Sequence, residues 1–172
     1  AFDNAVREWI HGFASPVVTQ FFLGVTVMGS TVVIVGAGIA AVIGFLMIGD
    51  KGAAVALATV VVGEPLLSLA IKDYYLRVRP EPYFGYSLPN SFSFPSGHSF
   101  ASFCLYFMIA WLISRRTRSK VVAPLLWASA IMIVLLVGLS RIYLGVHYPT
   151  DVIAGYLAAA FWSSTVLFAY HK

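Results

Sequence analysis

Charged side chains are scarce in this sequence. Lys, Arg, Asp and Glu together make up 10% of the 172 residues, whereas hydrophobic residues make up 60% and the mean hydropathy is +0.87. Soluble domains carry about 25% charged residues. Because so few charges cannot cover a surface exposed to water, the composition excludes a soluble globular protein and indicates an integral membrane protein.

Cysteine and acidic residues are also few. Cys104 is the single cysteine, which excludes an internal disulfide and a multi-cysteine metal site, and its apolar surroundings predict a packing role. Of the seven acidic residues, Asp73, Glu81 and Asp151 fall near the polar segments described below. Phosphoryl transfer that depends on Mg²⁺ needs a cluster of carboxylates. We therefore expect no metal and no other cofactor.

The net charge of +4 is not evidence for nucleic-acid binding. Four of the eleven basic residues form one cluster, Arg115, Arg116, Arg118 and Lys120. Basic residues concentrate in the short cytoplasmic loops of membrane proteins, which explains such a cluster more simply. We expect membrane lipids as the surroundings, no nucleic acid as a partner and no obligate protein partner.

Long apolar segments dominate the rest of the chain. A membrane-spanning helix needs about 20 apolar residues, and five segments qualify: Thr31 to Ile48, Gly52 to Ile71 (broken only by Glu64 and Pro65), Gly97 to Ile113, Val121 to Leu139, and Val152 to Tyr170. No linker or repeat divides the chain. The sequence therefore predicts an all-α, polytopic membrane helix bundle that forms a single domain over residues 1–172.

The chain before Thr31 has a different pattern. Apolar residues recur at helical spacing between charged ones from Phe2 to Phe13, which predicts an amphipathic helix for the membrane surface. From Pro16 to Gly29 the chain continues without charge, as a short, partly inserted helix would.

Basic residues in the loops predict the orientation. If the five spans alternate, Lys51, the tract from Arg115 to Lys120, and Lys172 share one side, which should be cytoplasmic. The opposite side holds five basic residues, and four of them belong to segments with a chemical role: Lys72, Arg77, Arg79 and Arg141. We therefore expect a multi-pass protein of a bacterial inner membrane, with its polar segments on the extracytoplasmic face.

Three polar segments converge on that face. They are KDYYLRVRP (72–80), PSGH (95–98) and SRIYLGVHYPTD (140–151). Taken singly, each has a simple structural explanation, such as basic side chains that extend to lipid headgroups or a proline in the first turn of a helix. Three of them at alternating helix ends, all on one side, instead indicate a functional site.

Together these segments offer the groups that bind a phosphate. Lys72, Arg79 and Arg141 supply cationic donors, and the free N–H groups at a helix start near Ser96 and Gly97 favour an anion. The sequence has neither the Cys-x₅-Arg motif of cysteine phosphatases nor an Asp-x-Asp pair. The remaining candidates for a nucleophile are histidines.

The same residues resemble the signature of the type 2 phosphatidic acid phosphatases, membrane lipid phosphatases related to bacterial acid phosphatases and vanadium haloperoxidases. That signature is Lys, six residues, Arg-Pro; Pro-Ser-Gly-His; and Ser-Arg, five residues, His, three residues, Asp. Every position is present here, at Lys72 with Arg79-Pro80, at Pro95 to His98, and at Ser140-Arg141 with His147 and Asp151. The resemblance runs from about Gly52 to the C-terminus, although bacterial members usually have six spans rather than five.

The resemblance implies a role for each residue. His147 would attack phosphorus and form a phosphohistidine, with Asp151 orienting its ring. His98 would protonate the leaving oxygen and then activate water. The phosphoryl oxygens would be held by Lys72, Arg79, Ser96, Gly97 and Arg141.

Other interpretations remain open at this point. The substrate would be a lipid phosphate such as phosphatidylglycerol phosphate, phosphatidic acid or undecaprenyl pyrophosphate, and the three motifs do not choose among them. A vanadate-dependent haloperoxidase could use the same cradle, and a lipid-binding or transport protein is a non-enzymatic alternative. Arg77 is a candidate headgroup contact, and Glu64, a carboxylate in mid-span, has either a structural or a functional role.

Overall fold

The computed structural model describes residues 2–88 and 90–170, and this part of the chain is helical, with no β-strand. The helices are α1 (Phe2–His11), α2 (Pro16–Val27), α3 (Thr31–Met47), α4 (Lys51–Tyr75), α5 (Gly97–Ser114), α6 (Val122–Tyr143) and α7 (Pro149–Tyr170). The predicted all-α bundle is confirmed, and Glu64 and Pro65 do not interrupt α4. The longest connection, residues 76–96, lies between α4 and α5.

Polar caps fix where the apolar helices begin. Ser15, Ser30, Asp50 and Ser96 each accept a hydrogen bond from the backbone N–H three residues later, at 3.3, 3.5, 2.8 and 3.4 Å. These side chains satisfy N–H groups that a helix start leaves without a partner. The short polar interruptions of an otherwise apolar sequence are therefore the points at which one helix gives way to the next.

Four helices are long and apolar enough to cross a membrane, namely α4, α5, α6 and α7. The predicted first span, α3, is apolar but has 17 residues, the lower end of the spanning range. The pair α1 and α2 would make another apolar span, but the chain bends by 119° between them. Residues Pro16–Val27 thus form the short helix expected from the sequence.

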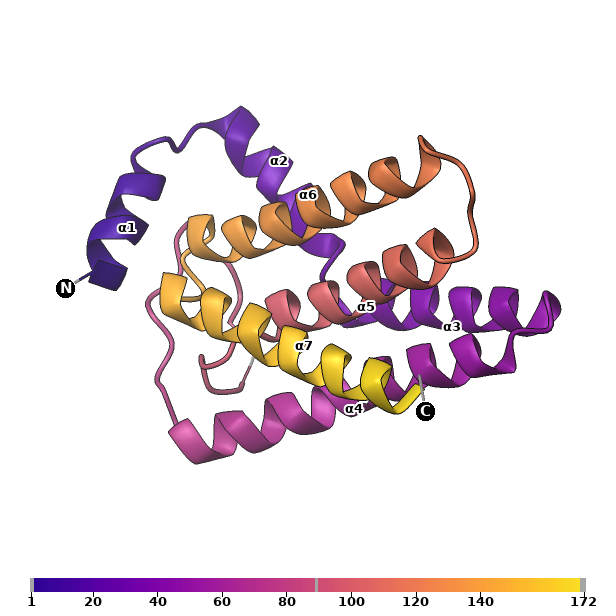
Figure 1. Ribbon diagram of the computed structural model, residues 1–172. Helices are drawn as coiled ribbons and strands as arrows, with labels where there is room; N and C mark the ends of the chain where they lie inside the picture. The colour runs from indigo at the N-terminus through magenta and orange to yellow at the C-terminus, as the bar shows by residue number, and fades with distance from the viewer. Residues whose placement is uncertain (1, 89, 171–172) are drawn as a thin grey trace.

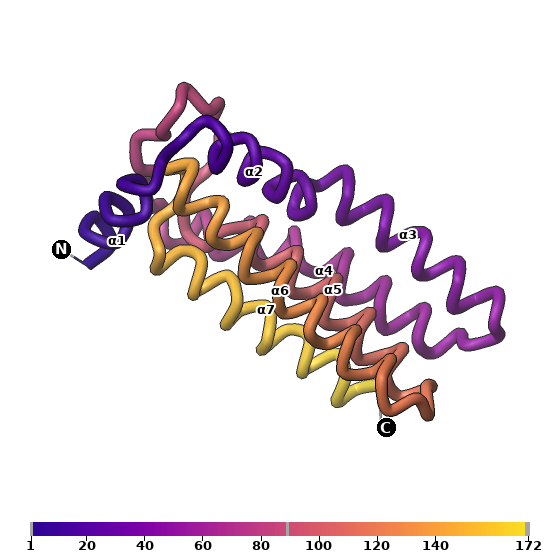
Figure 2. The backbone as a smooth tube through the Cα atoms, turned by 90° about the horizontal axis from the view of Figure 1, so that it is seen from above, coloured from indigo at the N-terminus to yellow at the C-terminus, as the bar shows by residue number. Residues whose placement is uncertain are grey.

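Helix α5 lies at the centre of the bundle. It packs against α3, α4, α6 and α7, and Figures 1 and 2 show the long helices side by side with their axes roughly aligned. The core between α3, α4, α5 and α7 contains fully buried Leu57, Val60, Phe100 and Leu105. A smaller cluster around Tyr143 joins α1 and α2 to the ends of α6 and α7.

The amphipathic helix α1 lies across the end of the bundle at which α4 and α6 end (Figure 1). It turns Arg7 and Ile10 inward and leaves Phe2 and Trp9 exposed. Arg7 donates to the carbonyl of Glu81 at 2.9 Å, so α1 is attached to the 76–96 loop.

The predicted cytoplasmic loops meet at the opposite end. Arg116, in the connection between α5 and α6, forms an ion pair with Asp50 in the turn between α3 and α4. The basic tract is therefore remote from the end that carries the three motifs. Lys172, which belongs to the same predicted side, lies outside the described residues.

Candidate active site

The three predicted motifs come together at one end of the bundle. The loop after α4 folds back, and Ser93 N–H donates to the Arg77 carbonyl at 2.8 Å. The N–H of Ser96 donates to the Asp151 carbonyl at 3.0 Å, which ties the start of α5 to the start of α7. A Cβ on Gly155 would lie 2.8 Å from the Ser96 carbonyl oxygen, so a glycine is needed for this close approach.

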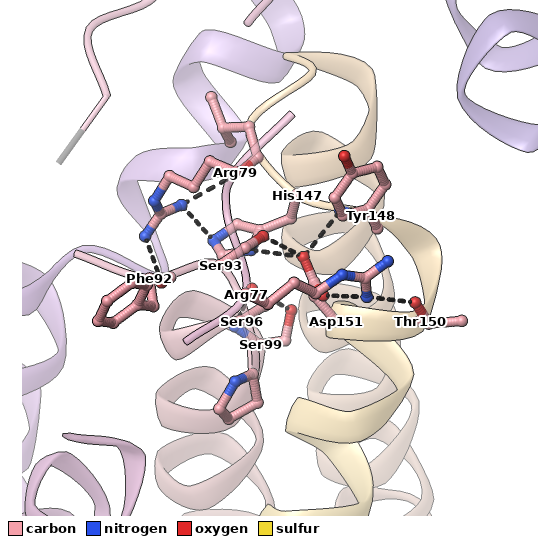
Figure 3. A network of polar contacts seen from close by, with 12 residues as sticks. Arg77, Arg79, Phe92, Ser93, Ser96, Ser99, His147, Tyr148, Thr150 and Asp151 are labelled. Atoms are coloured by element: carbon pink, nitrogen blue, oxygen red, sulfur yellow. Dashed lines mark hydrogen bonds and ion pairs between the residues drawn. The ribbon is translucent and has the colours of Figure 1, made fainter. Parts of the chain in front are cut away.

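His147 and Asp151 form a buried pair. His147 lies in the connection between α6 and α7, Asp151 lies in the first turn of α7, and His147 Nδ1 is 3.3 Å from Asp151 Oδ2. Both side chains are almost fully buried. The same carboxylate oxygen accepts the Ser93 hydroxyl and, at 2.9 Å, the Tyr148 N–H (Figure 3). Asp151 is therefore fixed in place and in turn fixes the imidazole ring.

Arg79 faces the other ring nitrogen of His147. Its Nη1 lies 2.9 Å from His147 Nε2 and donates to the Val146 carbonyl at 3.1 Å. A guanidinium only donates hydrogen bonds, so Nε2 must present its lone pair and the ring proton must lie on Nδ1, toward Asp151. In this tautomer the lone pair of Nε2 accepts a hydrogen bond from the Arg79 guanidinium, a cation.

The electrostatic surroundings keep His147 neutral. Burial, together with the positive charges of Arg79 and Arg141, lowers the pKa of His147 to about 3, although the hydrogen bond to Asp151 opposes the change. Burial and the charge of Arg141 also lower the pKa of Arg79, to about 10. At neutral pH the imidazole therefore has a lone pair and the guanidinium keeps its charge.

Lys72 and Arg79 hold the 76–96 loop over the site. The Lys72 ammonium donates to the carbonyls of Phe92 and Pro95 at 2.8 and 2.7 Å. Arg79 donates to the carbonyl of Ser91 at 2.7 Å and to its hydroxyl at 3.0 Å. Both predicted phosphate ligands thus lie at the site, where they also order the chain that precedes α5.

The start of α5 contributes Ser96, Gly97 and His98. The Ser96 hydroxyl is fully buried and receives the Ser99 N–H and, at 3.0 Å, the Ser99 hydroxyl. It caps the helix, so its predicted contact with phosphate stays a prediction. His98 is partly exposed, makes no hydrogen bond within the described chain, and lines a cavity together with Gly97.

Arg141 lies in the last turn of α6, 2% exposed. Its Nη1 donates to the Thr26 hydroxyl of α2 at 2.6 Å, and its Nε is buried without a partner in the described chain. A buried donor without a partner costs free energy, so an anion at this position would be stabilised. The apolar segment before Thr31 thus supplies a contact to a predicted site residue.

Arg77 makes contacts that the sequence did not predict. A headgroup contact was the interpretation from sequence, but Arg77 donates to Asp151 Oδ1 and to Asp3 Oδ2, both at 2.7 Å. It also lies over the Tyr148 ring, 4.1 Å from the centroid. The guanidinium thus connects the Asp151 carboxylate to α1, and the headgroup contact stays a prediction.

Sequence reasoning missed Ser93 and Asp3. Ser93 is buried and donates to Asp151, while Asp3 accepts from both Arg77 and Thr150. Neither belongs to a spaced motif, and Ser93 is one of three serines close together in the tract SFSFPS. An acidic residue in the first turn of a helix, such as Asp3, is common and gave no signal of this contact.

The described residues at this end provide no group of side chains that could coordinate a metal ion. Among residues 2–88 and 90–170, no group of three His, Cys, Asp or Glu side chains comes close enough to hold an ion. Arg and Lys dominate the surroundings of His147 instead. The bundle and this cationic cluster define a class: an integral membrane protein with a site for a phosphate-like anion at one end of its helices.

Comparison with known proteins identifies the family. Residues 53–172 match the model of the PAP2 superfamily, so the chain belongs to that superfamily of phosphatases. It is 32% identical over 165 residues to phosphatidylglycerophosphatase B of Bacillus subtilis, covering 90% of this chain and 76% of the relative. It is 36% identical over 123 residues to a lipid A 1-phosphatase of Rhizobium etli, covering 63% of this chain but only 46% of that relative.

Two solved structures share the fold. The crystal structure of a transmembrane PAP2-type phosphatidylglycerolphosphate phosphatase from Bacillus subtilis matches with a TM-score of 0.84 and 29% identity, over 99% of this chain and 85% of the other. LpxE from Aquifex aeolicus matches with a TM-score of 0.69 and 25% identity, over 97% and 95% of the two chains. The chain is thus an integral membrane phosphatase with the helix arrangement of its family.

Proposed function

We propose that this protein hydrolyses a lipid phosphate through a phosphohistidine on His147, without a metal. One observation supports this most directly: His147 Nε2 presents a lone pair toward Arg79 while Nδ1 faces Asp151. This is the arrangement that a neutral nucleophilic histidine needs. The phosphate would enter between His147 Nε2 and Arg79 Nη1, which lie 2.9 Å apart without substrate.

The reaction proceeds in two displacements. In the first, Nε2 attacks phosphorus, the P–O bond to the lipid breaks, and His98 donates its proton to the leaving oxygen. Asp151 stabilises the charge that develops on the His147 ring. In the second, His98 takes a proton from water, the resulting hydroxide attacks phosphorus, and the P–N bond breaks to restore His147.

The cations stabilise charge on the phosphoryl group. Arg79 lies 2.9 Å from Nε2, Lys72 and Arg141 are close enough to Arg79 to interact with its charge, and the Gly97 N–H lies at the start of α5. Preorganised donors in a site closed to water stabilise a transition state more than they do in bulk water. Their present hydrogen bonds to carbonyls and to Thr26 keep them directed at the site in the absence of substrate.

We infer a glycerophospholipid monophosphate as the substrate class, with phosphatidylglycerol phosphate as the leading member. The relative covered to 76% of its length is named for this activity. Phosphatidic acid carries the same phosphomonoester and undecaprenyl pyrophosphate carries a terminal phosphoryl group on a diphosphate, so both belong in the same assay. The protein would act in the bacterial inner membrane with its site on the extracytoplasmic face, opposite the basic tract that includes Arg115 and Arg116.

The test is phosphate release from these three lipids by purified protein in detergent with EDTA. We expect turnover of at least one glycerolipid monophosphate in chelator and inhibition by vanadate, which mimics the transferring phosphoryl group. Complete loss of activity in EDTA with recovery on Mg²⁺ would exclude the metal-independent mechanism. His147→Ala is the matched inactive control.

A further inference from the structure

Glu64 is a buried acid in the middle of the apolar helix α4. Its side chain is 7% exposed, and no described residue makes a hydrogen bond or an ion pair with its carboxylate. A carboxylate inside a membrane span is costly and is retained where it has a function. The mechanism above does not use it.

The carboxylate lines a cavity that reaches the site. This cavity of about 280 Å³ lies between α3, α4 and α5, with Glu64 and Ser68 on one wall and Gly97 and His98 on another. A Cβ built on Gly97 would lie 3.7 Å from the Ser68 hydroxyl. Glu64 lies one helical turn before Ser68 in α4. Glu64 therefore lies below His98 on the same open path.

The cavity lies on the side of the leaving group. In a displacement at phosphorus the attacking and leaving atoms are roughly in line, so the lipid oxygen must face away from His147. His147 does not line this cavity, whereas His98, the proposed acid for that oxygen, does. The atoms of the lipid next to the broken bond would therefore enter the space that Glu64 borders.

An apolar groove continues from the cavity. It has a volume of about 460 Å³, lies between α3 and α4, and shares Val35, Val61 and Pro65 with the cavity. Its rim includes exposed Ile39 and Ile43, which would face the hydrocarbon of the membrane. From His98 outward, the path thus offers a small polar chamber and then a surface suited to acyl chains.

We propose that Glu64 determines specificity for the leaving group. Its carboxylate accepts a hydrogen bond from a hydroxyl or lies beside the uncharged glycerol carbons next to the broken bond, and it repels a leaving group whose negative charge lies directly next to that bond. The protein therefore prefers phosphomonoesters of glycerolipids to prenyl diphosphates, whose leaving group is a second phosphate. This inference rests on the proposed function, because that function places the leaving group near His98.

The experiment compares kcat/KM for dioctanoyl phosphatidic acid and farnesyl diphosphate at about pH 9, so that the Glu64 carboxyl is ionised. Glu64→Gln keeps the size and hydrogen-bonding capacity of the side chain but removes the charge. At the effective dielectric of a protein, one charge substantially changes the interaction with a neighbouring charged group. We therefore expect the preference for the monoester to fall by about 10-fold or more, through faster diphosphate turnover. Asp73→Asn removes the same charge from an exposed position of α4 and should change the ratio by less than about 2-fold.

A binding measurement separates this inference from the proposed function. In the His147→Ala background, dissociation constants for the same two lipids, with and without Glu64→Gln, report the charge effect without turnover. If Glu64→Gln leaves the ratio of the two dissociation constants unchanged, for example through an equal loss of affinity for both lipids, the specificity role is overturned even if the enzyme is active. Failure of the wild type to hydrolyse either lipid counts against the proposed function, and the binding ratio still decides the role of Glu64.

Discussion

Arg77 Nη1 donates to Asp151 Oδ1 at 2.7 Å, while Nη2 of the same guanidinium donates to Asp3 at 2.7 Å. One arginine thus connects the carboxylate that contacts His147 to the amphipathic helix α1. Asp151 Oδ2 is left for His147, Ser93 and the Tyr148 N–H. The orientation of the His147 ring therefore depends on a side chain from the loop between α4 and α5, and through it on the N-terminal helix.

Arg77→Ala should lower kcat by about 10-fold or more with little change in KM, because it leaves a buried carboxylate with one donor fewer and loosens the ring. Asp3→Asn should have a smaller effect, since the contact between Arg77 and Asp151 remains. Steady-state kinetics on one lipid phosphate measures both, with Arg118→Ala as an exposed arginine control. A raised KM with normal kcat would instead support a headgroup contact for Arg77.

The two histidines should be separable by trapping the covalent intermediate. His147→Ala removes the nucleophile, so no labelled phosphoenzyme should form with any substrate. His98→Ala removes the proton donor, which is worth about 10²–10⁴-fold for a poor leaving group such as an alkoxide and much less for p-nitrophenolate. Rapid quench with radiolabelled p-nitrophenyl phosphate should therefore give acid-labile label on His98→Ala. Label on His147→Ala and none on His98→Ala would reverse the two assignments.

The pH dependence of phosphorylation should show that His147 stays neutral at acidic pH. Burial and the nearby arginines lower the pKa of His147 to about 3 from the ordinary value of 6.5, so the lone pair on Nε2 remains well below neutrality. With p-nitrophenyl phosphate, whose leaving group needs little help, the burst of phosphoenzyme at about pH 5 should equal that at about pH 7. A burst that falls by half near the ordinary histidine pKa would contradict the buried, cation-flanked state of His147.

Cysteine labelling should place the site on the outer face. Cys104 is buried and can be replaced by Ala, and Ser87 and Ser119 are exposed at opposite ends of the bundle. In intact cells, an impermeant maleimide should label Ser87→Cys and should label Ser119→Cys only after the cells are opened. The reverse pattern would put the active site in the cytoplasm.

The sequence by itself determined the helical class and the approximate extent of the long helices, and it supplied the residues proposed for the site. The length of an apolar segment is set by the bilayer, and the caps Ser30 and Ser96 bond neighbouring N–H groups, so the starts of α3 and α5 followed from local patterns. The ends of α4 and α6 did not, because each helix extends four residues beyond the predicted ends at Ile71 and Leu139. Fixed spacings placed Lys72, His98 and His147 at helix ends on one side. All of these properties depend on neighbours along the chain.

Only the tertiary structure decided how these residues are connected. Residues 76–96 have no periodicity, and their side-chain partners depend on where the loop folds back onto α7. For that reason the pairing of Arg77 with Asp3, 74 residues away, was not predictable, and neither was the contact between Arg79 and His147 Nε2. The same holds for Glu64, whose position in α4 was evident but whose cavity exists only because α3 and α5 pack beside it. Contacts between distant segments arise from packing, and packing is a property of the whole bundle.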